Sequence, residues 1–440
     1  MSEVAEQSDR SHYLADLATL QQGSAPEWLH ALRQNGVNRF EAIDMPHYKQ
    51  EAWRFTDIKQ VIRTPFRSIS DSIVPSQLKE QIQAHLYQEA DWSELVFIDG
   101  VFTPELSNLN ASPDGVTVSS LGDAVSNHAE MVQSHLNKIH NSTHAFSTLN
   151  DAVLGDGGFI HVGPNTVSKQ PIHFLFISTG ADSLATHPRT LVLLEPSSQA
   201  TVLESYIGLN DDSTYFTNGV TEVSVGDNAQ LTRFKIVKEG KHSFHLGTDA
   251  VHQGQDSTYT SYVLALEGQI NRNEIDLKLN GRGSQCDLNG LYLNDRDRLI
   301  DNALHVTHAA SNCYSRMGYK GVLDGSSKSV FTGKVLVPPD SQKTDSDQLN
   351  NNLLLSDKAT IDTKPQLEIF ADDVKCTHGA TIGGFPPELL FYFQSRGIDP
   401  LKANGILTYG FAAEVIDRIE LAPLQARMAE YVFELFSPEH

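Results

Sequence analysis

The sequence predicts a mainly β protein with helical regions at both ends. One observation is a unit of apolar strand, short polar turn and second apolar strand, which recurs between residues 155 and 383. The other is the hydrophobic period, which alternates in the core, as in residues 275–279, and is helical near the termini. We therefore divide the chain into residues 1–154, 155–383 and 384–440.

The first region, 1–154, is predicted to hold helices joined by loops. Ser24 is a candidate N-cap for a helix that Gly36 would end, because glycine often terminates helices. Residues 103–143 are rich in Ser, Asn, Asp and Gly, which indicates a surface connection. The segment Glu51-Ala-Trp-Arg-Phe-Thr-Asp57 is aromatic and mixed, and its periodicity assigns it to neither helix nor strand.

The core, residues 155–383, contains five copies of the strand–turn–strand unit. Gly, Asp, Asn and Ser supply the turn geometry between the apolar segments. The turns do not recur at one fixed interval, which excludes a solenoid with a regular repeat. The pattern alone is compatible both with an irregular β-helix and with a large sandwich. The copies span residues 193–203, 223–231, 277–286, 322–330 and 353–361.

The C-terminal region, 384–440, returns to a helical period. Asp399 and Pro400 form an N-cap followed by proline at the first helical position, which predicts a helix that continues to Ile419. A last amphipathic helix follows, with apolar residues recurring at helical spacing. These apolar faces could pack on the β core or form a docking surface for another protein.

Composition narrows the function classes. The chain carries 33 Lys and Arg against 55 Asp and Glu, a net charge of −22, which disfavours nucleic acid and anionic membranes as partners. Three widely spaced cysteines form no disulfide framework, and the acidic N-terminus lacks the apolar segment of a secretory signal. No apolar run is long enough to span a membrane. We therefore expect a cytoplasmic protein.

Sequence motifs give no support to the usual enzyme classes. The sequence lacks a Walker A motif, a dinucleotide fingerprint, an H-E-x-x-H helix and a G-x-S-x-G elbow. The compact group of metal-binding residue types is Cys376-Thr-His378, whose side chains would share one face of a strand. Thiolate and imidazole suit iron and zinc, but two ligands cannot complete a tetrahedral site. A second molecule or a distant segment would have to complete it.

Several ordered motifs together resemble the SufB/SufD family of iron–sulfur cluster assembly proteins. The stretch 365–383, which includes Cys376 and His378, is similar to the signature of the SufD branch. The resemblance covers most of the chain. Its other motifs are residues 51–57, 318–325, 330–335, 350–356, 390–392, 395–398 and 410–415.

The family resemblance implies a fold, partners and a site. It implies a right-handed parallel β-helix core, and a non-catalytic scaffold that pairs with SufB and binds the ABC-type ATPase SufC. Nascent clusters would form at the SufB interface, where Cys376 and His378 match the family motif. No cofactor would be held stably by this chain alone, although a transient iron–sulfur cluster could be shared with SufB. Only Glu388 could stand in for the acidic residues that relatives carry after this motif.

The same resemblance implies that the C-terminal helices dock SufC. The apolar contacts are assigned to two stripes at helical spacing. These residues are Phe411, Val415 and Ile419, followed by Leu424, Met428 and Val432.

Two alternatives remain open. One is a SufB-like paralogue of the same complex. The other, from a different class, is a β-helix enzyme acting on polysaccharides, which requires carboxylates with raised pKa values converging on a cleft. A homodimer of the isolated chain is also compatible with the sequence.

Overall fold

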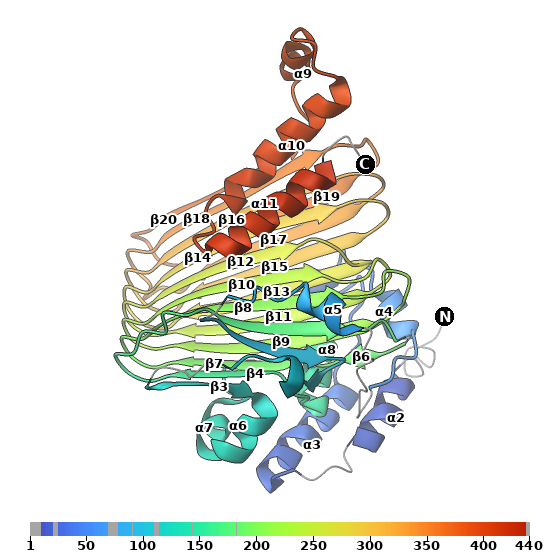
Figure 1. Cartoon of the computed structure of the whole chain (residues 1–440). Coiled ribbons are helices and arrows are strands. Elements are labelled where there is room, and N and C mark those ends of the chain that lie inside the picture. The colour runs from blue at the N-terminus through green and yellow to red at the C-terminus, as the bar shows by residue number, and fades with distance from the viewer. Residues whose placement is uncertain are drawn as a thin grey trace.

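The protein is a parallel β-helix, built from two facing sheets and flanked by helices (Figure 1). Among the described residues, strands hold 40% and helices 26%, so the predicted mainly β fold and β-helix core are confirmed. A sandwich of antiparallel sheets is excluded because nearly all strand pairs are parallel. The computed structural model describes residues 10–20, 25–68, 78–89, 91–109, 114–141, 144–181 and 183–436.

The first sheet has ten strands in the order β2-β1-β5-β8-β10-β12-β14-β16-β18-β20. Its order skips alternate strands because the chain crosses to the other sheet after nearly every strand. The bounds are β1 Ser93–Ile98, β2 Val101–Phe102, β5 Ile172–Ser178, β8 Gln199–Gly208, β10 Gln230–Lys238, β12 Thr258–Ala265, β14 Gln285–Asn294, β16 Tyr314–Leu323, β18 Asp345–Leu354 and β20 Lys375–Gly383.

The second sheet runs in the order β19-β17-β15-β13-β11-β9-β7-β4-β3, with the short β6 beside β9. All five units recognised in the sequence are strand–turn–strand segments that cross between the sheets. The bounds are β3 Val116–Ser120, β4 Gly158–Val162, β6 Ala185–Thr186, β7 Arg189–Leu194, β9 Phe216–Val225, β11 Phe244–Gln253, β13 Ile270–Leu279, β15 Leu299–His308, β17 Lys328–Val337 and β19 Thr360–Ile369.

The polar turns stack into a ladder along one side of the β-helix. Successive turns each place one residue in the left-handed region, which Asn, Asp and Gly tolerate best. The backbone N–H of Asn228 donates to the carbonyl of Gln255 at 2.7 Å, and other turns repeat this bond. The turn residues therefore join neighbouring coils, where a coil is one full turn of the β-helix. The left-handed residues are Ser197, Asn228, Asp256, Gly283, Asn312 and Lys343.

The N-terminal region contributes strands as well as the predicted helices, since β1, β2 and β3 lie before residue 155. The predicted first helix is α3, which continues past Gly36, while Ser24 lies outside the described residues. A side chain at Gly36 would meet the backbone of Ala152 in α8 at 2.5 Å, so this glycine permits close helix packing. The α-helices here are α2 Ser11–Leu20, α3 Glu27–Ala42, α4 Lys59–Arg63, α5 Lys79–Gln83, α6 Leu121–Asn127, α7 Ala129–His135 and α8 Ala145–Val153, with one-turn 3-10 helices at Glu51–Trp53 and Pro104–Leu106.

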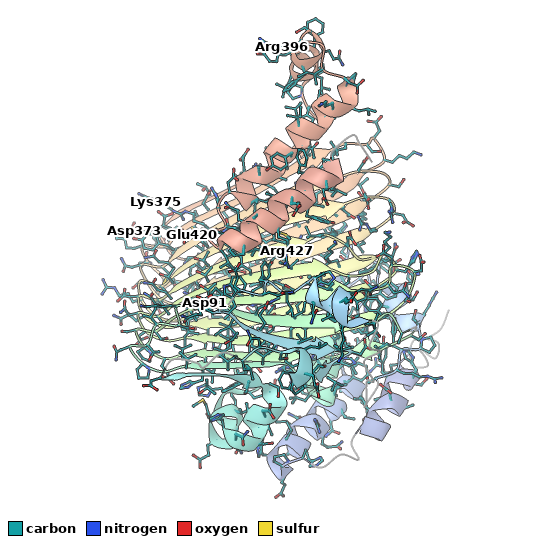
Figure 2. The ribbon with its side chains drawn as sticks, viewed as in Figure 1. Asp91, Asp373, Lys375, Arg396, Glu420 and Arg427 are labelled. Carbon is teal, nitrogen blue, oxygen red and sulfur yellow. The ribbon has the colours of Figure 1, made fainter. Side chains whose placement is uncertain are left out.

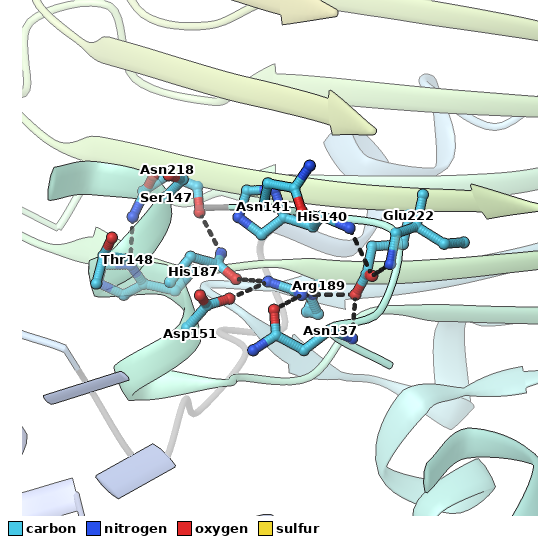
Figure 3. Close-up of polar contacts among 12 residues, drawn as sticks. Asn137, His140, Asn141, Ser147, Thr148, Asp151, His187, Arg189, Asn218 and Glu222 are labelled. Carbon is cyan, nitrogen blue, oxygen red and sulfur yellow. Dashed lines mark hydrogen bonds and ion pairs between the residues drawn. The ribbon is translucent and has the colours of Figure 1, made fainter. Parts of the chain in front are cut away.

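A buried ion network fastens α8 to the β-helix (Figure 3). The guanidinium of Arg189 donates to Asp151 of α8 at 2.9 Å and to Glu222 of β9 at 2.6 Å. Glu222 also accepts backbone N–H groups from Asn137, Ile139 and His140. All three charged side chains are fully buried. Each charge is therefore paired as burial requires.

Three helices end the chain: α9 Pro387–Gln394, α10 Pro400–Ile416 and α11 Ala422–Phe436. Asp399 caps α10 by accepting the backbone N–H of Leu401 at 2.8 Å, as the sequence predicts. Helices α10 and α11 form a hairpin against the first sheet, while α9 projects beyond it (Figure 1). No described helix combines the length and apolar character needed to cross a membrane.

Candidate functional site

The last coil of the β-helix, formed by β19 and β20, leaves its outer edges unpaired. Each strand ends its sheet, so within the described chain one edge of each carries backbone N–H and C=O groups without a strand partner. Both are long and regular, with ten and nine residues. Such edges are templates for pairing with another chain, and native proteins usually cover or shorten them.

The interior of this coil is also open. Val335 and Val337 are fully buried in β17, whereas Leu367 and Ile369, directly above them in β19, are only partly buried. Apolar side chains that stack in register along the inside of the second sheet are therefore fully buried in β17 but only partly buried one coil later, in β19. At the end of the other sheet, Ile382 is 51% exposed. We call this surface of β19 and β20 the open end.

Cys376 lies at the open end, at the start of β20. Its side chain packs partly against the apolar core inside the β-helix. In the strand register, Cys376 is paired with Ser346 of the neighbouring strand β18. Burial raises the pKa of the Cys376 thiol. The thiolate is the metal-binding form, so ligation here must drive off a proton. Cys286 and Cys313 are buried deeper in the β-helix.

His378 is exposed two residues further along β20, on the same strand face as Cys376 by alternation. In the strand register, His378 is paired with Gln348 of β18. The buried side-chain oxygen of Gln348 has no hydrogen-bond partner among the described residues. The two residues that the sequence singled out are therefore brought to one face, as expected. Among the described residues, no three His, Cys, Asp or Glu side chains gather to hold a metal ion. A complete ligand set at this edge would need groups from another molecule.

Comparison with known proteins assigns the family. The model of the SUF system FeS cluster assembly SufBD core domain matches residues 176–411, and that of the SufBD protein N-terminal region matches residues 4–174. The chain belongs to the SufBD family of iron–sulfur cluster assembly proteins. The resemblance seen in the sequence motifs is thereby confirmed.

Relatives of this SufBD protein match over nearly their full length. The iron–sulfur cluster assembly protein SufD of Escherichia coli is 30% identical over 89% of this chain and 92% of its own. A SufBD family protein of Synechocystis is 34% identical, covering 91% of this chain and 89% of its own. SufD of Bacillus subtilis is 24% identical over 92% of this chain and 94% of its own.

The two apolar stripes predicted to bind a partner lie on the C-terminal hairpin, but they face inward. Five of the six side chains are buried against the first sheet, and Phe411 is partly buried. They pack with β-strand residues such as Phe234 and Leu291. In this conformation the five buried residues offer no contact surface. They are Val415, Ile419, Leu424, Met428 and Val432.

The exposed apolar surface of this region lies instead on α9 and the start of α10. Phe391 is 69% exposed and Leu401 is 73% exposed, and no residue of α9 is buried. Arg396 stands at the tip of this projection, remote from Lys375 on the last coil (Figure 2). Glu388 lies in the first turn of α9, also exposed. The sequence did not distinguish these residues from the inward-facing stripes.

Two cavities of the protein lie away from the Cys376 and His378 pair. A cavity of about 1060 Å³ is lined by residues 41–63 and neighbours, and one of about 420 Å³ lies between residues 51–56 and the outer face of the second sheet. Burial raises the pKa of Asp99 and of Asp156, yet neither carboxyl group lines these cavities. The two carboxyl groups with raised pKa values therefore do not form, at these cavities, the pair that a polysaccharide-acting enzyme requires.

Proposed function

We propose that this SufBD protein is a non-catalytic scaffold subunit for iron–sulfur cluster assembly, pairing with SufB through its open end. The observation that carries the proposal is the unpaired edge of β19 and β20. A related β-helix has strands of matching spacing, so edge-to-edge pairing would satisfy the backbone groups of both chains. The partly exposed interior residues would gain an apolar cover in the same step.

Cys376 and His378 are proposed to contribute ligands to a nascent cluster at that interface. Both lie on the edge strand, so a facing chain could supply the missing ligands. The cluster is the cargo of the assembly and is shared transiently between the chains. Thiolate and imidazole are suitable ligands for it.

The second partner is proposed to be the SufC ATPase, bound through the exposed face of α9 and the start of α10. Phe391, Tyr392 and Leu401 are large apolar side chains exposed on a projecting element, which is typical of a docking surface. This proposal replaces the inward-facing stripes with residues that a partner can reach. Placing glutamate at Phe391 and Leu401 should abolish SufC binding, whereas Phe433→Glu, on α11, should not.

Co-purification with tagged SufB and SufC, followed by iron and sulfide analysis, tests the assignment. Wild type should form a complex that accumulates iron and sulfide. His378→Ala should form the complex but accumulate little of either, and Cys376→Ser should show a smaller loss. His242→Ala is the matched control, because His242 is an exposed histidine in a turn away from the open end. Normal cluster content in His378→Ala would refute the assigned site.

A further inference from the structure

Arg427 ties the C-terminal hairpin to the N-terminal region, beside apolar packing of the hairpin on Trp92. Arg427 of α11 donates to the carbonyl oxygens of His85 at 2.8 Å and of Leu86 at 2.9 Å. Its guanidinium also lies 3.9 Å from the ring centroid of Tyr87. These contacts join positions more than 340 residues apart in the chain. We call Arg427 together with residues 85–88 the clamp.

The clamp is tied in turn to the first strand of the sheet. Glu94 of β1 accepts the backbone N–H groups of Tyr87 at 2.8 Å and of Gln88 at 3.1 Å. The Tyr87 ring packs against Trp92 with centroids 4.9 Å apart. Gln88 adopts a left-handed φ of 55°, a conformation that non-glycine residues hold only when their surroundings fix it.

From Glu94 the polar contacts continue across three neighbouring strands. Its carboxylate lies 3.1 Å from Nδ1 of His173, whose Nε2 lies 2.9 Å from the hydroxyl oxygen of Ser205. The order acid, histidine, serine matches a hydrolase triad, but Ser205 is only 4% exposed and His173 is fully buried. His173 and Ser205 therefore hold the Glu94 carboxylate in place, and Glu94 in turn holds the clamp.

Arginine is the residue type that this geometry requires. Its planar guanidinium can donate to two successive carbonyl groups and stack on an aromatic ring at the same time. A lysine would keep the charge but could not reproduce the paired hydrogen bonds in a fixed plane. The rest of α11 is attached differently, through apolar side chains such as Leu424 and Met428 and a 3.0 Å hydrogen bond from Tyr431 to Glu267.

We infer that Arg427 is a positioning residue, and that the clamp makes the order of the hairpin and of residues 85–98 interdependent. The hairpin carries α9 and α10, so the clamp fixes the angle at which their exposed face is presented. The inference about order concerns this chain alone. Its consequence for partner binding rests on the proposed function.

Hydrogen exchange of the full-length chain tests the interdependence without any partner. Arg427→Met should accelerate exchange at least tenfold both in α11 and in residues 85–98, with β14 to β18 unchanged. Arg427→Lys should have an intermediate effect. Arg418→Met is the control, because the Arg418 side chain donates to Asn289 at 3.3 Å and none of its described contacts involves the clamp. Residues 85–98 should therefore exchange as in wild type.

The reciprocal variant is Glu94→Gln, which should accelerate exchange in α11 although it does not touch that helix. If Arg427→Met changes α11 alone, or Glu94→Gln changes residues 85–98 alone, the interdependence is refuted. Exchange in β14 to β18 separates local loosening from global unfolding. Should Arg427→Met unfold the chain, the comparison of Arg427→Lys with wild type decides in the same way.

A binding measurement then connects the clamp to the docking surface. Arg427→Met should weaken SufC binding severalfold, because a loosened hairpin must be ordered on association. Unchanged SufC affinity in a variant with accelerated exchange would show that the clamp does not position the docking face. Failure of the wild type to bind through Phe391 and Leu401 would instead refute the proposed docking surface and leave the exchange result intact.

Discussion

The two ends of the β-helix differ in how their outermost strands are terminated. At the N-terminal end the outermost strands are short and antiparallel: β2 has two residues and β3 has five. Helix α6 packs on β3, β4 and β7 beside them. At the other end, β19 and β20 are long and parallel, and no described strand pairs with their outer edges. The end at β2 and β3, which we call the closed end, is thus finished within the chain, whereas the open end is left free for the pairing proposed above.

The two ends also differ in the burial of their ion pairs. Near the N-terminal end, Arg189 and its two carboxylates are buried together (Figure 3). On the coils next to the open end, ion pairs between strands are exposed, as in Arg316 of β16 with Asp345 of β18 at 2.7 Å. Buried pairs are costly to break, whereas exposed pairs contribute little. The closed end is therefore the more sensitive one to substitution.

Arg189→Met should lower the free energy of unfolding by about 3–5 kcal/mol, because it removes the buried cation that pairs with Glu222 while Glu222 stays buried. Arg316→Met is the matched change on the coils next to the open end and should cost less than about 1 kcal/mol. Denaturant unfolding of both variants measures the difference. Equal costs would contradict the contrast between the two ends.

Acid should destabilise the closed end through His187, which is buried beside Asn218 and Phe216. Burial lowers the pKa of His187 to about 3. In the unfolded chain this histidine binds a proton below about pH 6.5, whereas in the folded chain it stays neutral to much lower pH. His187 therefore leaves the free energy of unfolding unchanged above pH 6.5 and lowers it as the pH falls.

At pH 5 the loss from His187 should be about 2 kcal/mol, from 1.36 kcal/mol per unit of pKa difference. His187→Gln should flatten the pH dependence of stability between pH 6.5 and 5 by that amount. A His378→Ala variant is the control at the open end, since His378 is exposed. An unchanged slope in His187→Gln would show that this histidine is not the titrating group.

At the open end, substitution should affect association more than folding. Ile382→Glu places a charge on a side chain that is already 51% exposed, so stability should change by less than about 0.5 kcal/mol. The affinity for SufB should fall roughly tenfold, or about 1.4 kcal/mol, because the charge must be desolvated on pairing. Val167→Glu is the control, since Val167 is similarly exposed, at 45%, and lies away from the open end. Equal SufB affinities for the two variants would show that the open end is not part of the interface with SufB.

The sequence predicted the class of the fold and the face of the candidate site. Turn residues such as Asn228 and Gly283 mark the crossings between sheets, and strand alternation alone places Cys376 and His378 on one face. These features are local, so a single sequence can encode them visibly.

Long-range features were not predictable in the same way. The stripe of Leu424 and Met428 shows helical amphipathicity, but its sequence does not say whether a sheet or a partner covers it. The Arg427 contacts to residues 85–86 and the Arg189 network join distant segments, and no spacing pattern reveals them. Gly36 is typical of a helix end, whereas α3 continues past it, since its close approach to Ala152 shows only in three dimensions.

Hydrogen exchange of this chain with and without SufB tests the central claim, that the open end is the pairing surface, most directly. The account predicts new protection in residues 360–383, strongest in the edge amides of β19 and β20. Strands β2 and β3 at the closed end should exchange at their original rates. Protection confined to the closed end or to the C-terminal hairpin, with residues 360–383 unchanged, would contradict it.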